Sequence, residues 1–270
     1  MKGKKALYLY CIRGKTDSKF FMKGIDGQGD VFTLPYQNLE AVVSAVQLEE
    51  FDSEEIKQRA QTDIHWIKDK ALIHEAVIEA AMHCNGKIIA VIPMCFGTLF
   101  TSLASIQQIF KKSYLKLENT LRNLQGKQEL GVKVYLENSK ALEDEVQIRN
   151  EVLKAKKKEL LTMSKGRAYF FEKQIKETID AEVKNSIETY MQDIFLDLEY
   201  HSETSLKGKI LEKEFTGKLE PMVLNAFYLV QERNIEIFKS EINRLSAEIG
   251  PKGFRLEYSG PWPPYNFAQL

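Results

Sequence analysis

The sequence predicts an α+β protein of two domains: an N-terminal α+β unit, and a C-terminal modified ferredoxin-like domain with a long helical arm, closed by an extended proline- and aromatic-rich tail. Its 270 residues reach the size at which one hydrophobic core usually stops growing, about 250 to 300 residues. Segments with the apolar alternation of strands are interspersed with segments of helical three-to-four spacing. From Gly131 onward, the order strand, helical arm, strand, strand, helix, strand matches the split β-α-β pattern of a ferredoxin-like sheet. We place the first domain at residues 1–128, the second at 129–258 with its arm at about 139–198, and the tail at 259–270.

The composition is that of an ordinary soluble globular protein, with 44% hydrophobic and 28% charged residues. The 38 basic and 38 acidic residues balance, so neither nucleic acid nor an anionic membrane surface is favoured as a partner. No apolar run approaches the ~18 residues of a membrane span, and no signal-peptide cleavage pattern follows the N-terminal lysines. Three cysteines without a Cys-x-x-Cys pair predict neither disulfides nor a zinc site, but small core or half-buried residues. We therefore expect a cytosolic protein.

The first domain opens with alternating segments that predict strands at residues 5–12, 31–36 and 41–46. Residues 24–30 form a glycine-rich turn. This turn is not a dinucleotide-binding loop, because a strand follows it instead of a helix. Its two aspartates lack the ligand register and closing glutamate of a calcium-binding EF-hand. We therefore predict a flexible turn here, without a cofactor or metal.

A long helix should begin at the Asp52-Ser53 cap and run to the Asn85-Gly86 stop signal. His74 is the polar member of its apolar stripe. Without a second ligand at helical spacing, we expect His74 to be a buried, hydrogen-bonded core residue and not a functional one. We expect the whole stripe to face the core; it consists of Ile56, Ala60, Ile64, Ile67, Ala71, His74, Ile78 and Met82.

The remaining elements follow from the same two periodicities. Strands are predicted at residues 87–93, 131–136, 222–230 and 254–258, with a weaker one within 201–215. Amphipathic helices are predicted at residues 102–124, 139–164, 167–198 and 232–249. The two middle helices form the arm, and the lysine run within them is typical of a solvated face.

The tail is the most unusual stretch, SGPWPPYNF at residues 259–267. Its prolines exclude a helix or a central strand, so we expect it to run extended. Two interpretations of its rings remain open. The tail can pack over a groove of its own domain, or it can be a polyproline-type ligand offered to another protein. The candidate contact or packing residues are Trp262, Pro263, Pro264, Tyr265 and Phe267.

We find no pattern that predicts catalytic, cofactor-binding or metal-binding residues. Arg13-Gly14-Lys15-Thr16 contains Gly-Lys-Thr but lacks the earlier glycine of a phosphate-binding loop.

A second candidate contact site comprises Arg167, Tyr169 and Phe170, because arginine beside aromatic rings is common at interfaces. The alternative is that these rings pack on the sheet. A small-molecule-binding or enzymatic ferredoxin-like protein is the competing class, and its first residues to examine are His74, His65 and Asp69. We expect the latter two to form a surface ion pair.

Several segments together resemble the gas vesicle protein GvpL/GvpF family across the whole chain. The tail is the most specific of them. The others are IPMCFGTLF at 92–100, GVKVYLE at 131–137, KGRAYFFEKQ at 165–174 and NAFYLV at 225–230. The DIHWIKDKA segment at residues 63–71 and the Gly-Arg-x-x-Phe-Phe-Glu-Lys pattern at 166–173 look more like the L branch than the F branch.

The resemblance implies a non-enzymatic accessory or minor structural protein of gas vesicles, the gas-filled flotation organelles of some prokaryotes. It implies two α+β domains, the second a modified ferredoxin-like fold, and no cofactor. The implied partners are the small hydrophobic shell protein and other gas vesicle accessory proteins, with assembly in the cytoplasm. One departure is Cys95, where the family often has a basic residue, so the resemblance implies no role for positive charge at that turn in this chain.

Overall fold

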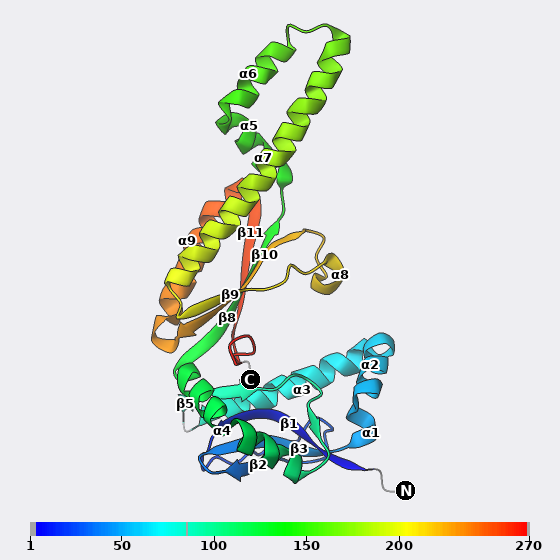
Figure 1. Ribbon diagram of the computed structural model, residues 1–270, viewed down its shortest axis with the longest axis vertical. Coiled ribbons are helices and arrows are strands. Elements are labelled where there is room, and N and C mark those ends of the chain that lie inside the picture. The colour runs from blue at the N-terminus through cyan, green and yellow to red at the C-terminus, as the bar shows by residue number, and fades with distance from the viewer. Residues whose placement is uncertain (1–3, 85, 269–270) are drawn as a thin grey trace. The chain divides into compact units, whose positions relative to one another are not determined.

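The computed structural model describes residues 4–84 and 86–268, and it consists of helices and sheets in both halves of the chain (Figure 1). The mixed α and β class predicted from periodicity is therefore confirmed. The chain divides into two compact units. One comprises Met1–Glu129 together with Trp262–Leu270, and the other comprises Leu130–Pro261. The last segment of the chain thus belongs to the first unit.

The sheet of the first unit has five strands in the order β2-β3-β1-β6, with β7 paired to β1. Neighbouring strands in this sheet pair antiparallel. Strands β1 and β3 are buried along nearly their whole length. Alternate side chains of both strands enter the core beside α3. The strands are β1 (Lys5–Gly14), β2 (Val31–Tyr36), β3 (Leu39–Gln47), β6 (Val91–Pro93) and β7 (Leu99–Phe100).

The prediction of one continuous helix after Asp52 is wrong. Asp52 does cap a helix, because its side chain accepts from the backbone N–H groups of Glu54 and Glu55. Asp63 then leaves the helical conformation, with φ −143° and ψ 71°, and its side chain caps a new helix at the Trp66 N–H. The segment therefore folds as α1 (Leu48–Phe51), α2 (Ser53–Thr62) and α3 (Ile64–Met82).

The predicted apolar stripe is also only partly correct. His74, Ile78 and Met82 are buried, whereas Ile64 is 50% exposed. The break at Asp63 separates α2, which has no buried residue, from α3, whose buried residues all lie in its C-terminal half. After α3, β4 (His83–Cys84) pairs with β5 (Lys87–Ile88); Asn85, predicted as part of the stop signal, lies outside the described residues.

The remainder of the first unit contains a split strand and one long helix. The single strand predicted at residues 87–93 is instead split into β5 and β6. The predicted helix at 102–124 is confirmed as α4 (Leu103–Leu124), which Ser102 caps at the Ser105 N–H. Its buried side chains are Ile106, Phe110, Leu117, Leu121 and Leu124.

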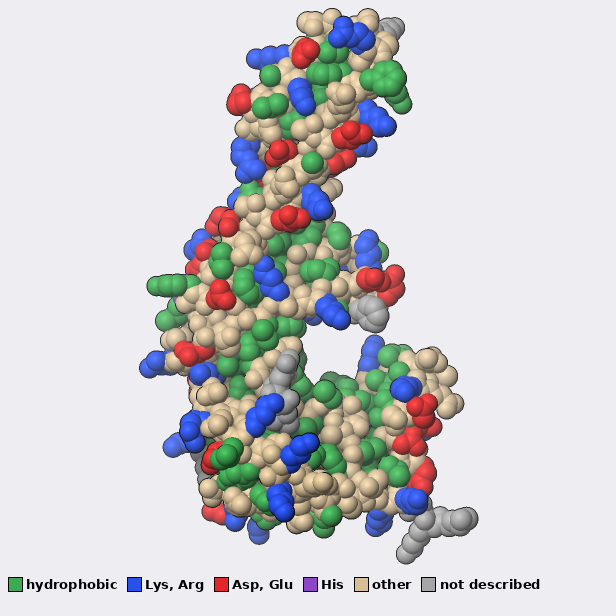
Figure 2. All heavy atoms as spheres, in the orientation of Figure 1, with side chains coloured by type: hydrophobic (Ala, Val, Ile, Leu, Met, Phe, Trp, Pro, Cys, Tyr) green, Lys and Arg blue, Asp and Glu red, His purple; other side chains and the backbone are tan. Residues whose placement is uncertain are grey.

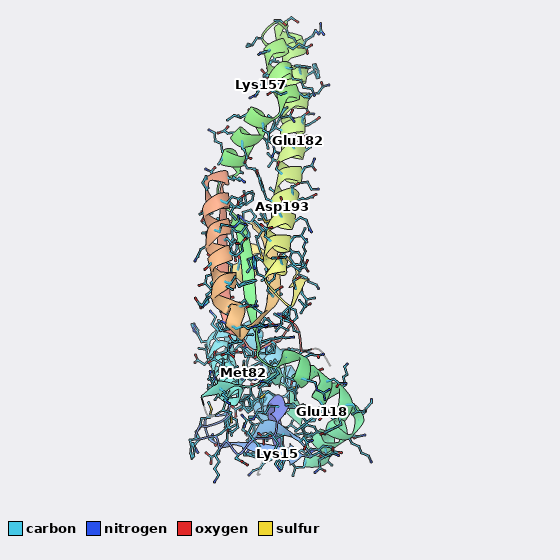
Figure 3. All side chains as sticks on the ribbon, turned by 90° about the vertical axis from the view of Figure 1, so that its left-hand side faces the viewer. Lys15, Met82, Glu118, Lys157, Glu182 and Asp193 are labelled. Carbon is cyan, nitrogen blue, oxygen red and sulfur yellow. The ribbon has the colours of Figure 1, made fainter. Side chains whose placement is uncertain are left out.

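The second unit contains a four-stranded sheet in the order β11-β8-β10-β9. Its core lies between this sheet, α9 and the C-terminal half of α7, which run side by side in Figures 1 and 3. The predicted inward face of α9 is confirmed, since Ile235, Phe238, Ile242, Leu245 and Ile249 are all buried. The elements are β8 (Lys127–Leu136), β9 (Thr204–Lys207), α8 (Lys213–Thr216), β10 (Met222–Gln231), η1 (Glu232–Asn234), α9 (Ile235–Ile249), η2 (Gly250–Lys252) and β11 (Phe254–Trp262).

Between β8 and β9 the chain forms the helical arm: α5 (Ser139–Arg149), α6 (Glu151–Leu160) and α7 (Lys165–Tyr200). The helix predicted at 139–164 is broken, because the Asn150 side chain caps a new helix at the N–H groups of Val152 and Leu153. The arm has a small core of its own, built from Val146, Leu153 and Ile175. It can therefore extend beyond the sheet as a hairpin.

The extended tail is also only partly as predicted. Strand β11 continues through Pro261 to Trp262, which the prolines permit because β11 is a terminal strand of its sheet. The chain then turns. The N–H groups of Phe267 and Ala268 both donate to the Pro264 carbonyl, at 3.2 and 2.9 Å.

Candidate functional site

His74 lies in a closed hydrogen-bond chain in the first unit. Its Nε2 is 3.1 Å from the Met94 carbonyl, which can only accept, so Nε2 carries the proton. Its Nδ1 then accepts from the Tyr8 hydroxyl at 3.0 Å, and that hydroxyl accepts from the Gly97 N–H at 2.9 Å. Burial lowers the pKa of His74 to about 4, against the opposing effect of the Met94 hydrogen bond. Both ring nitrogens are occupied, so the prediction of a buried core histidine is confirmed.

The Arg13-Gly14-Lys15-Thr16 segment has a structural use. Arg13 is fully buried, and its Nε donates to Glu40 Oε1 at 2.8 Å. Its other nitrogens donate to the Ala81 carbonyl of α3 at 2.7 Å and to Thr16 Oγ1 at 3.0 Å. The guanidinium therefore joins two strands to a helix, which accounts for the residues that superficially resemble a phosphate-binding loop.

The aspartates of the turn at residues 24–30 are also occupied. Asp26 Oδ1 accepts from the N–H groups of Gln28 and Gly29, at 2.9 and 3.0 Å. Asp30 pairs with Lys23 at 2.7 Å. Within residues 4–84 and 86–268, no cluster of three or more His, Cys, Asp or Glu side chains could hold a metal ion.

The cysteines and histidines are divided between buried and exposed positions. Cys11 is buried and Cys84 half-buried, but Cys95 is exposed. The prediction of a core or half-buried position is therefore wrong for Cys95, which lies in the turn after β6. His65 and Asp69 are exposed on α3, whereas His74 is buried, so the residues named for a small-molecule site do not converge. Contrary to prediction, His65 and Asp69 form no ion pair within the described part of the chain.

The tail residues pack in a seat on the first unit that contains two carboxylates. Tyr265 packs against the core cluster of β1, β3 and α3, and its hydroxyl donates to Glu75 Oε2 at 2.7 Å. Asn266 donates to both oxygens of Glu129, from its backbone N–H at 2.8 Å and from its side-chain amide at 2.5 Å. Pro263 and Pro264 are buried and Phe267 is half-buried, whereas 39% of Trp262 is exposed.

The tail seat has unusual electrostatics. Burial raises the pKa of Glu75, and the Tyr265 hydrogen bond only partly opposes this. Burial likewise raises the pKa of Glu129, with a further contribution from the charge of Glu75. Glu75 Oε1 is buried and has no hydrogen-bond partner among the described residues. The seat therefore binds the tail through acceptors that are costly to ionise.

The second predicted contact site lies on the arm. Tyr169 and Phe170 are 68% and 70% exposed near the start of α7, with ring centroids 5.6 Å apart in an edge-to-face arrangement. The alternative in which these rings pack on the sheet is therefore wrong. Arg167 is exposed beside them.

A surface that the sequence did not indicate lies along β2, the terminal strand of the first sheet. Phe32 on this strand is 39% exposed, and Phe21 in the preceding loop is 94% exposed. We call this surface, formed by β2 with Phe21 and Phe32, the β2 edge. A shallow hollow beside it is lined by Ser18, Lys19, Phe20, Val31, Phe32 and Thr33. Periodicity could not reveal it, because strand order is a tertiary property.

Comparison with known proteins identifies the family. The family model described as "Gas vesicle synthesis protein GvpL/GvpF" matches residues 6–269. This chain belongs to the GvpL/GvpF family. Its relatives in that family include gas vesicle protein F1 of Halobacterium salinarum, 24% identical over 98% of this chain and 93% of the relative. Gas vesicle protein L of a Streptomyces species is 26% identical over 88% of this chain and 82% of the relative.

Solved GvpF structures share the fold of this GvpL/GvpF protein. The GvpF crystal structure from Anabaena sp. covers 98% of this chain and 99% of its own, with a TM-score of 0.75 at 20% identity. GvpF from Microcystis aeruginosa matches with the same coverage and a TM-score of 0.69. Both F and L relatives match at similar identity, so membership of the L branch stays a prediction. Within the described helices, none has the length and apolar character needed to cross a bilayer.

Proposed function

We propose that this protein is a non-catalytic accessory or minor structural protein of the gas vesicle. In this proposal it binds the small hydrophobic shell protein and other gas vesicle accessory proteins in the cytoplasm while the vesicle assembles. The observation that carries the proposal is the family match over residues 6–269, because it spans both units and the tail. The occupied state of His74, Arg13 and the turn aspartates supports a binding role over catalysis.

The proposal includes a ferredoxin-like fold for the second unit. The strand order β11-β8-β10-β9 corresponds to fourth, first, third and second strand along the chain. The long helices lie between the first and second strands and between the third and fourth, and the four-residue α8 lies between the second and third. This succession supports a split β-α-β architecture whose first crossover is enlarged into the arm.

The β2 edge is our candidate for the shell-protein contact. A terminal strand presents unpaired backbone donors and acceptors to a further strand, and the exposed rings of Phe21 and Phe32 add apolar area that is unfavourable in water. The Val31 N–H already donates to the Met22 carbonyl at 3.1 Å and Pro35 lacks an N–H, so a further strand would pair with the middle of β2. This combination fits strand addition by an apolar segment.

The tail has a more limited part in the proposal. Tyr265 and Phe267 contribute to packing in the seat, as do the two buried prolines. Trp262 remains a candidate contact residue, because 39% of it is exposed at the end of terminal strand β11.

The first experiment is deletion of the gene in a gas-vesicle-forming cell and complementation with the full chain. We expect vesicle formation to be lost and then restored. Normal vesicles in the deletion strain would refute an essential role in assembly.

Co-purification then tests the contact surface. The Phe21→Glu/Phe32→Glu variant should lose the shell protein while retaining a native circular dichroism spectrum. Leu115→Glu on α4 is a matched control, since Leu115 is 73% exposed in the same unit. Trp262→Ala tests the tail separately. Retention of the shell protein by the double variant would exclude the β2 edge as its binding site.

A further inference from the structure

The end of the arm concentrates charge and exposed apolar side chains in one place. We call residues 154–173 the arm tip; they include most of α6 and the first turns of α7. In Figure 3 the labelled Lys157 lies in this part of the arm, far along the helices from Asp193, which lies beside the sheet. The arm tip is therefore a part of the second unit that covers none of the sheet.

The arm tip is strongly basic. It contains seven lysines and arginines and two glutamates, although the whole chain has 38 basic and 38 acidic residues. Figure 2 shows lysine and arginine side chains around hydrophobic ones at this end of the arm. Part of this charge is compensated locally, because Lys154 pairs with Glu151. Lys157 donates a hydrogen bond to the neutral side chain of Gln147 and keeps its charge. The arm tip nevertheless contains five more basic than acidic residues.

The apolar side chains at the arm tip are not part of the arm core. That core is formed by Val146, Leu153 and Ile175, with Phe171 packed against it. Leu161 is 85% exposed, and the Tyr169 and Phe170 rings project beyond the core with 68% and 70% of their surface exposed. Exposed rings beside an arginine are typical of the residues that dominate binding energy at protein interfaces.

We propose that the arm tip docks on an acidic protein surface with an apolar pocket that accepts Tyr169 and Phe170, while Arg167 pairs with a carboxylate beside it. The basic excess requires an acidic partner. It is not suited to the hydrophobic strand that the β2 edge fits, so this partner differs from the shell protein. The inference rests on the proposed function for one point, which is that the partner is sought among the gas vesicle accessory proteins.

The same observations argue against an anionic lipid surface. A helix that lies in a membrane interface presents a continuous apolar face, but Leu153 on α6 is fully buried and Leu160 packs inward against the arm core. Glu159 and Glu172 also interrupt the basic surface. Single-stranded nucleic acid needs a basic groove that follows the backbone, whereas the arm tip is the end of a helical hairpin (Figure 1).

The test uses the purified full chain and each accessory gas vesicle protein of the same cell, produced individually, as probes. Binding is measured at low and high salt for the wild type, Arg167→Glu and Tyr169→Ser/Phe170→Ser. We expect one acidic protein to bind, more weakly in high salt, and each variant to reduce its affinity roughly 30-fold or more, as hot-spot residues do. The Leu115→Ser/Lys116→Glu control pairs an exposed leucine with a lysine on α4 and should change affinity by less than about twofold.

Other outcomes are equally decisive. Wild-type affinity of both arm-tip variants for every accessory protein would overturn the inference. Ring-dependent binding to phosphatidylglycerol vesicles, but not to phosphatidylcholine vesicles, would replace the protein partner with a lipid surface, and ring-dependent binding to a single-stranded oligonucleotide would replace it with nucleic acid. The inference fails alone if the arm-tip variants bind normally while the β2 edge variant loses the shell protein. Normal vesicles in the deletion strain contradict the proposed function but leave arm-tip binding measurable.

Discussion

The hydroxyl of Tyr265 donates a 2.7 Å hydrogen bond to Glu75 Oε2, joining residues 190 positions apart in the chain. The next residue, Asn266, donates twice to Glu129. These contacts hold the last described turn of the chain on the first unit, after the whole second unit has intervened. The tail therefore closes the unit in which the chain began.

The Tyr265→Phe variant should weaken the seating of the tail. Without the hydroxyl, Glu75 Oε2 loses its donor, and Oε1 already has none among the described residues. An unsatisfied buried acceptor costs about 1–3 kcal/mol. We expect a lower unfolding free energy in urea and faster proteolysis near residue 262. Tyr258→Phe, at a 43% exposed ring, is the control, and equal protease resistance of the two variants would contradict the prediction.

Glu129→Gln should flatten the pH dependence of stability above pH 4.5. The pKa of Glu129 is raised above its ordinary value of 4.5, first by burial, so the folded state holds the proton more tightly than the unfolded state. The stabilisation that comes from this tighter proton binding by Glu129 is therefore fully present below pH 4.5, and it is lost as pH rises through the raised pKa. Glutamine does not ionise, which removes this loss, although it also costs one hydrogen bond to Asn266. Urea midpoints across pH 4.5–8 measure the slope, with exposed Asp69→Asn as control; an unchanged slope would count against this account.

His74→Gln should remove a pH dependence on the acidic side. The folded pKa of His74 is about 4, below its ordinary value of 6.5. Between these values the unfolded state takes up a proton that the folded state rejects, so stability falls as pH falls from 6.5 toward 4. The variant should be less stable at pH 7 by about 1–3 kcal/mol, because the hydrogen-bond chain is broken. Its stability should then change less between pH 6.5 and 4 than that of exposed His65→Gln.

Arg13→Met should strongly destabilise the first unit. It leaves the Glu40 carboxylate, only 2% exposed, without its guanidinium partner. Breaking a buried ion pair costs about 3–5 kcal/mol, whereas replacing both partners by apolar groups is often neutral. Arg13→Met/Glu40→Leu should therefore recover much of the lost unfolding free energy. Additive destabilisation in this double-mutant cycle would show that the pair does not act as a unit.

Much of the secondary structure could be predicted, because it depends on local periodicity. The inward face of α9 and the span of α4 follow from apolar residues three or four positions apart. The two missed helix breaks also had a local signal. Asp63 and Asn150 are both N-cap residue types, but the periodicity continues across them closely enough to suggest unbroken helices.

By itself, the sequence determined the mixed α and β class, the positions of most strands, the burial of His74 and the resemblance to the GvpL/GvpF family. Tertiary structure decided that the tail packs on the first unit, that Arg13 pairs with Glu40 and that Tyr169 and Phe170 remain exposed. The physical reason is that these features depend on contacts between residues far apart in the sequence. Periodicity marks which face of an element is apolar, but the surface that covers this face, or leaves it in water, comes from residues as distant as Glu75 is from Tyr265.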